Sequence, residues 1–258
     1  MSDERLPFTA HLEELRRRLI ICFIAVLIGF LACYAFKERI YDFLAIPIYA
    51  SLPENSTMIF TRVPEAFFTL LKVSFLAGFF LALPVIFYQT WAFIAPGLYK
   101  KEKMLVAPFV IFSTLFFVTG SGFGYFVVFP YGFEFLMGFG GDKLKAMPSM
   151  GEYLSFASKL LIAFGLVFEL PLITYFLSKA GLITHHTLAK NRRYFIVLAF
   201  IASAALTPPD VITQLLMAGP LIILLEISIL VARVFGRKPL TDGEGDLLDE
   251  EELRHPAG

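Results

Sequence analysis

Long apolar runs, separated by short connections that contain charges, Pro or Gly, dominate the chain. A helix needs about 20 apolar residues to cross a hydrocarbon layer of roughly 30 Å, and most of these runs approach that length. They are apolar on every face, whereas a membrane β-strand would alternate over about ten residues. The pattern predicts an all-α, polytopic membrane protein with six transmembrane helices. The predicted spans lie near residues 19–36, 73–95, 104–129, 160–177, 194–206 and 211–231.

The six spans form one predicted membrane domain over residues 1–236. Composition agrees, because 57% of the 258 residues are hydrophobic and 30 are Phe. Residues 237–258 contain seven acids and are typical of a solvated, disordered tail. The basic start of the chain resembles a signal peptide, but the apolar run after it is long and no small-residue cleavage site is evident. We therefore expect it to remain as the first helix.

Lysine and arginine are unequally divided between the two sides of the predicted bundle. Fifteen fall in the terminal segments and in the connections after the second and fourth spans, and seven fall on the other side. The positive-inside bias therefore places both termini in the cytoplasm.

The connections also differ in kind. The fifth span, 194–206, covers only about 20 Å at 1.5 Å per residue, so we expect it to thin the bilayer locally. The long connections 37–62 and 130–159 are rich in Pro, Gly and aromatics, and we expect them to form a cap. The run "GSGFGY" (120–125) is typical of close helix packing.

Glu169 is a lone carboxylate in an apolar segment, with no other charge between Lys159 and Lys179. A carboxylate near the bilayer centre costs at least a few kcal/mol, so it is a functional candidate by default. The alternative is a structural hydrogen bond to a neighbouring helix. Pro171 follows and should kink the helix. On the last span, Asp210 can act as the N-cap.

Two short charged stretches contain further candidates. In "HLEELRRRL" (11–19), the arginines can be a simple topology anchor, while the leucines recur at a spacing that also permits a helix lying on the membrane surface. In "YKKEKM" (99–104), Glu102 stands among three lysines, and a surface ion pair there would contribute little.

Several chemistries have no support in the sequence. The nucleotide-binding pattern G-x-x-x-x-G-K-[ST] is absent, and no nucleophile–base set stands out. His185 and His186 are adjacent, which is poor spacing for metal ligands, and Cys22 and Cys33 form no recognisable framework. We expect no enzymatic activity, no cofactor, no metal and no nucleic-acid partner.

Five motifs, in chain order, carry a resemblance that covers residues 6 to about 235. They are "HLEELRRRL", "WAFIAPGLYKKEK", "YFVVFP", "FGLVFELP" and "LTPPDVITQ". With them the sequence resembles TatC, the polytopic subunit of the twin-arginine protein translocase. The resemblance implies a signal-peptide receptor and core subunit that exports folded proteins across the cytoplasmic (inner) membrane with proton-motive force. It also implies a multimeric complex in the lipid membrane with TatA-like and TatB-like single-span subunits.

The resemblance also assigns roles to residues. It implies that Glu14, Arg16, Glu102 and Phe93 bind the signal peptide, and that Pro47, Glu169, Asp210 and Gln214 serve partner contacts and transport. The chemistry agrees, since guanidinium groups pair bidentately with carboxylates and lysine cannot copy this geometry. We expect Glu14 and Glu102 to lie close together. Lys101 and Lys103 would repel an arginine pair unless they point away.

A proton-coupled small-solute transporter with Glu169 as proton relay is the alternative. Such transporters have broken helices and repeated halves. Only a six-residue echo exists here, between "LPVIFY" and "LPLITY".

Overall fold

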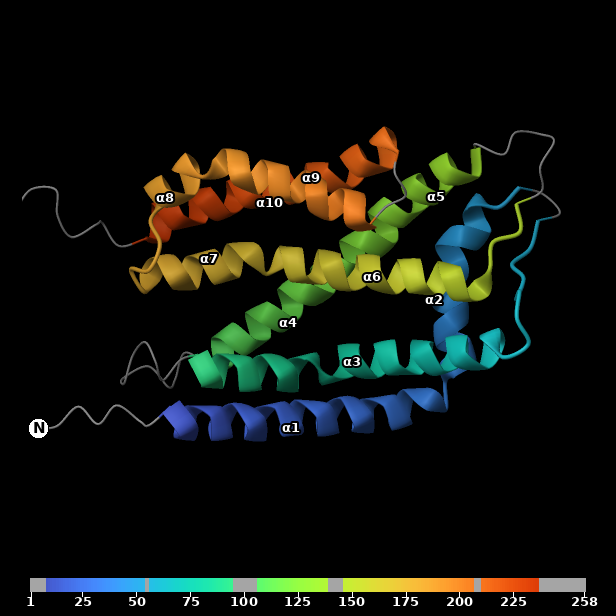
Figure 1. Cartoon of the computed structure of the whole chain (residues 1–258), viewed down its shortest axis with the longest axis horizontal. Helices are drawn as coiled ribbons and strands as arrows, with labels where there is room; N and C mark the ends of the chain where they lie inside the picture. Colours follow the sequence, from blue (N-terminus) through green and yellow to red (C-terminus); the bar gives the residue numbers. More distant parts are fainter. Residues whose placement is uncertain (1–7, 54–55, 95–105, 139–145, 207–209, 237–258) are drawn as a thin grey trace, which may run out of the picture.

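The computed structural model describes residues 8–53, 56–94, 106–138, 146–206 and 210–236, and every element that it assigns there is helical (Figure 1), which confirms the all-α class. The elements are α1 (Phe8–Tyr34), α2 (Lys37–Ser51), α3 (Glu65–Ile94), α4 (Val106–Phe123), the π-helical turn η3 (Gly124–Val128), α5 (Phe129–Gly138), α6 (Met150–Phe168), α7 (Leu170–Lys179), α8 (His185–Lys190), α9 (Arg192–Leu206) and α10 (Val211–Phe235).

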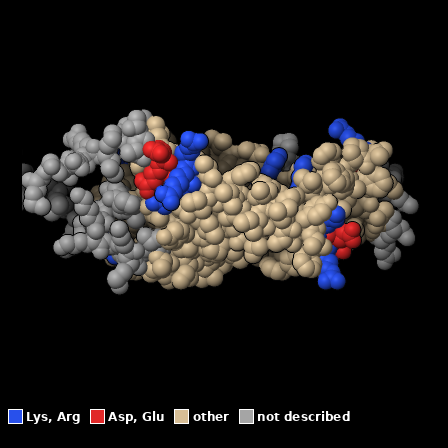
Figure 2. Space-filling view, turned by 90° about the horizontal axis from the view of Figure 1, so that it is seen from below, with Lys and Arg blue, Asp and Glu red and all other residues tan. Residues whose placement is uncertain are grey.

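Five helical stretches among the described residues are long and apolar enough to cross a membrane. They are His11–Tyr34, Glu65–Ile94, Ala107–Gly138, Met150–Lys179 and Val211–Phe235. The predicted fifth span lies in α9, which has 15 residues and rises only about 22 Å. The six-span count therefore stays a prediction. Figure 2 shows a long face of the molecule with a broad stretch free of Lys, Arg, Asp and Glu between charged groups nearer its ends.

The long helices lie along the long axis of the molecule, and α4 crosses them obliquely (Figure 1). We call the end at which α1 begins and α3, α7 and α10 finish the terminal end. The opposite end, where α2 and α5 lie, is the cap end. The connections predicted to form a cap thus contain two helices, α2 and α5.

Close contacts at small residues set the helix packing. A Cβ atom at Gly29 of α1 would lie 2.5 Å from the carbonyl oxygen of Gly78 in α3, so this crossing requires glycine on both helices. On α4, the Ser121 hydroxyl donates to the Leu161 carbonyl of α6 at 2.8 Å. A Cβ at Gly120 would collide with α6 at Phe164 and Phe168. The predicted close packing of "GSGFGY" is confirmed.

Hydrogen bonds from buried side chains hold the cap end together. The hydroxyls of Tyr125 and Tyr153 donate to α2 at the carbonyls of Phe43 and Leu44. The Glu65 carboxylate, at the start of α3, accepts from the Gly151 amide in the first turn of α6 at 2.8 Å. These bonds connect α2, α3, η3 and α6 into one unit.

Of the two readings of residues 11–19, the structure does not support a separate surface helix. These residues continue the first span as a single helix from Phe8 to Tyr34. The reason is the unbroken helix-forming sequence, which has neither Pro nor Gly between Phe8 and Gly29.

Candidate functional site

Glu14 is anchored by an arginine one turn further along α1. Its Oε1 atom accepts from Arg18 Nε at 3.0 Å and from Arg18 Nη2 at 2.6 Å. Among the described residues, no donor reaches Glu14 Oε2. The Glu14 side chain is 38% exposed, so one carboxylate oxygen is fixed and the other is available to a ligand.

Arg18 also joins α1 to the end of α3. Its Nη1 donates to Gln89 Oε1 at 3.1 Å, and its Nη2 donates to the Ala92 carbonyl at 3.2 Å. The Ala92 carbonyl lies in the last turn of α3, where helix carbonyls lack an intrahelical donor, so a cation there is favourable. Sequence reasoning missed both Arg18 and Gln89. The i, i+4 spacing of Glu14 and Arg18 was a signal that could have found the arginine.

Phe93 lies at the same terminal end, next to the start of α1. Its ring stacks on the His11 ring at a centroid distance of 4.4 Å and an interplanar angle of 17°. The structure therefore brings the Glu14 region and Phe93 together at one end of the α1–α3 pair. Glu102 lies outside the described residues, as do Lys101 and Lys103, so the expected proximity of Glu14 and Glu102 stays a prediction.

Arg16 faces elsewhere. Two residues along a helix are about 200° apart, so Arg16 does not share the Glu14 face. It is exposed and lines an apolar groove of about 460 Å³ along α1 with Leu12, Leu15, Leu19, Ile20 and Phe23.

Glu169 interrupts the fourth predicted span. It stands between α6 and α7, and Pro171 occupies the first turn of α7. Its side chain is buried, and its Oε1 has no hydrogen-bond partner in the described structure. The carboxylate does have a hydrogen bond with Ser113 of α4. Ser113 Oγ in turn accepts from the Trp91 indole of α3 at 2.8 Å, so a polar chain links three helices around Glu169.

The remaining predicted residues lie at the cap end, away from Glu14. Pro47 is buried inside α2, and its carbonyl accepts from the Ser51 hydroxyl at 2.9 Å. Gln214 Nε2 donates to the Phe200 carbonyl at 3.2 Å and so joins α10 to α9.

Asp210 is the N-cap of α10, as predicted. Its Oδ1 accepts from the Thr213 amide at 2.7 Å, and its Oδ2 accepts from the Thr213 hydroxyl. The hydroxyl and then the amide of Thr213 stabilise the charged carboxylate, which lowers the pKa of Asp210 from its ordinary value.

An ion pair that sequence reasoning missed joins α9 and α10. Arg192 Nη2 lies 2.5 Å from Glu226 Oε1. Glu226 is the other acid within the predicted spans besides Glu169, and its charge is paired by this arginine. Among the described residues, no group of three His, Cys, Asp or Glu side chains is placed to hold a metal ion.

Comparison with known proteins decides the family. Residues 10–220 match the family described as Sec-independent protein translocase protein (TatC). The chain belongs to the TatC family. The Sec-independent protein translocase protein TatC of Desulforapulum autotrophicum is 57% identical over 243 residues, or 94% of this chain and 90% of that protein. The TatC protein of Magnetococcus marinus is 47% identical over 236 residues, or 92% and 87% of the two chains.

Solved TatC structures share the fold. The crystal structure of a twin-arginine translocase receptor, TatC, has a TM-score of 0.79 and 46% identity, with 88% of this chain and 100% of that chain covered. A crystal structure of the TatC receptor in DDM gives 0.76 and 44%, covering 86% and 99%. As a member of the TatC family, the chain is a membrane-embedded component of a protein translocase.

Proposed function

We propose that this chain is the signal-peptide receptor and core subunit of a twin-arginine translocase that exports folded proteins. The similarity to solved TatC receptors supports this role. The single observation that carries it at the level of residues is the Glu14–Arg18 pair, which orients an acid at the terminal end and leaves Oε2 open.

The proposed recognition uses two acids for two guanidinium groups. Arg18 binds one oxygen of Glu14, so the carboxylate cannot rotate freely, and an incoming arginine meets an acceptor that is already oriented. A carboxylate has about four acceptor positions on its two oxygens, so Glu14 can bind both Arg18 and a ligand arginine. Glu102 supplies the second acid in this proposal, and the stacked rings of Phe93 and His11 form an aromatic wall near Glu14.

The wider setting follows from family membership and charge. The terminal end faces the cytoplasm, in an inner membrane, because Lys and Arg are concentrated on that side. TatA-like and TatB-like subunits are the proposed partners, and proton-motive force drives transport. The protein acts as a receptor and scaffold, not as an enzyme.

Glu169 is proposed to recruit a partner helix. A buried polar atom without a partner is costly, and Oε1 of Glu169 is such an atom in the described structure. A polar side chain on an incoming single-span helix would satisfy it. Pro47, Asp210 and Gln214 serve this function indirectly, because they shape the cap end that such a helix would contact.

Photo-crosslinking of a twin-arginine signal peptide to this protein in membranes tests the recognition site. The Glu14→Ala, Glu102→Ala double variant should lose crosslinking to the peptide. The matched control, Glu13→Ala with Glu134→Ala, removes two exposed acids elsewhere and should crosslink normally. Wild-type crosslinking by the first double variant would disprove the site. The small-solute transporter has no comparable support, since the matched relatives are translocase proteins.

A further inference from the structure

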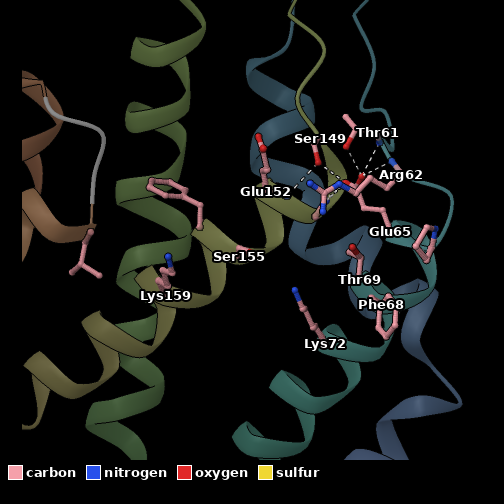
Figure 3. Close-up of a pocket in the computed structure, with 14 residues that line it drawn as sticks. Thr61, Arg62, Glu65, Phe68, Thr69, Lys72, Ser149, Glu152, Ser155 and Lys159 are labelled. Atoms are coloured by element: carbon pink, nitrogen blue, oxygen red, sulfur yellow. Dashed lines mark hydrogen bonds between the residues drawn. The ribbon is translucent and has the colours of Figure 1, made fainter.

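A pocket of about 610 Å³ opens at the cap end between the first turns of α3 and α6 (Figure 3). Three cations line it, and two of them, Lys72 and Lys159, come from the two helices that border it, α3 and α6 (Figure 3). The third is Arg62, from the segment before α3. Both lysines are exposed, and neither forms an ion pair with a described residue.

The acids of the pocket leave these lysines uncompensated. Glu65 is already saturated, because its Oε1 accepts from Ser149 and Gly151 and its Oε2 accepts from Thr61 and from the Arg62 amide. Glu152 is exposed, and its side chain is directed away from Lys72 in Figure 3. The pocket therefore presents free ammonium groups on its inner side.

The positions of Lys72 and Lys159 along their helices indicate which kind of ligand they would bind. Lys72 stands seven residues after the start of α3 and Lys159 nine residues after the start of α6, which places them about 10 and 13 Å along their helices. Both helices are apolar enough to span a membrane. Lysines inside such spans extend toward the headgroup level, where the anions are the phosphates of lipids.

The remaining lining is mixed. The hydroxyls of Thr69 and Ser155 can donate to phosphate oxygens, whereas Phe68, Phe156 and Leu206 offer apolar surface. A free phosphate would gain nothing from contact with the apolar surface, whereas a phospholipid has acyl chains that begin a few atoms from its phosphate and can pack there.

We propose that the pocket between α3 and α6 binds an anionic phospholipid, with Lys72 and Lys159 on its phosphodiester and the phenylalanines against its glycerol and first methylenes. Bound in this way, the lipid fills the pocket between α3 and α6. This site lies at the opposite end from Glu14 and goes beyond the proposed function.

Native mass spectrometry of the purified full-length protein tests the proposal. The protein is incubated with mixed micelles of phosphatidylglycerol and phosphatidylcholine in equal amounts, and the retained lipids are counted. The wild type should prefer phosphatidylglycerol. The Lys72→Gln, Lys159→Gln variant should bind phosphatidylglycerol about tenfold less tightly, since the loss of a charge-assisted hydrogen bond weakens binding by roughly this factor. The control Lys37→Gln, Lys190→Gln removes the same charge outside the pocket and should behave like the wild type.

Other measurements separate the possible outcomes. Lys72→Arg with Lys159→Arg keeps both charges and should retain the preference. Inorganic phosphate should not displace the lipid, and displacement would show a free-phosphate site instead. If the glutamine variant does not fold, raising ionic strength from about 0.05 to about 0.5 M decides the question on the wild type, because the shorter Debye length should abolish the preference. A salt-independent preference, no preference, or an unchanged preference in the glutamine variant would overturn the proposal.

Discussion

Arg18 donates from one nitrogen, Nη2, both to Glu14 on its own helix and to the carbonyl of Ala92 on α3. The orientation of the candidate acid is therefore coupled to the packing of α1 on α3. Lysine is a point charge on a flexible stem and cannot reproduce this forked geometry.

Arg18→Lys should accordingly weaken binding of a twin-arginine peptide while the protein still folds. We expect a loss on the order of tenfold, the scale of one charge-assisted hydrogen bond, measured as peptide affinity in detergent. Arg17→Lys, at an exposed neighbouring position, is the control. Equal affinity in Arg18→Lys and the wild type would show that the orientation of Glu14 is unimportant.

The glycine crossing predicts a stability effect. Gly78→Ala places a methyl group against the backbone of Gly29 and Phe30, and such overpacking costs about 1–3 kcal/mol. Thermal unfolding in detergent should show a lower midpoint. At Gly122 nothing lies within 4 Å of an added Cβ, so Gly122→Ala should leave the midpoint unchanged or raise it. Equal midpoints for Gly78→Ala and the wild type would contradict the close approach.

Glu169 should tolerate glutamine better than alanine. Glutamine keeps the volume and a hydrogen-bonding group beside Ser113, whereas alanine leaves a cavity and removes the polar group offered to a partner. Export of a twin-arginine reporter in cells should be reduced several-fold more by Glu169→Ala than by Glu169→Gln. Leu170→Ala changes an exposed neighbour and serves as the control. Normal export by Glu169→Ala would end the recruitment hypothesis.

The cap of α10 predicts a pH dependence. The pKa of Asp210 is lowered in the folded protein, so its contribution to stability is present above the unfolded pKa of about 3.9 and is lost as pH falls through the lower folded pKa. Asp210→Asn keeps a capping oxygen but does not titrate. Between about pH 5 and pH 3, the wild-type unfolding midpoint should fall more steeply than that of the variant. Parallel curves would show that Asp210 does not contribute in this way.

Sequence patterns were sufficient where one segment alone determines the outcome. Apolar length predicted the helices because a membrane span must be long and apolar. The cap at Asp210 and the interruption near Pro171 depend on local geometry. The helices extend beyond the predicted spans; α3, for example, begins at Glu65. The length of an apolar run indicates only the part of a helix that crosses the hydrocarbon layer, and not the turns that continue past it.

Contacts between distant segments could not be derived in this way. Arg18 and Gln89 are 71 residues apart, and their meeting depends on how α1 and α3 are rotated about their axes. The same holds for the ion pair of Arg192 with Glu226 and for the shared pocket of Lys72 and Lys159. A single sequence specifies the faces of each helix but not which faces meet.

The first helix has one principal neighbour, α3, and only a small part of its apolar span is buried within the molecule. If cargo binds near Glu14 as proposed, force on the bound peptide would be transmitted to the rest of the described bundle mainly through the contacts between α1 and α3. The outward side of α1 remains exposed to lipid or to a second protein. A partner bound there would change how α1 packs on α3, and with it the affinity for the peptide, without contacting Glu14.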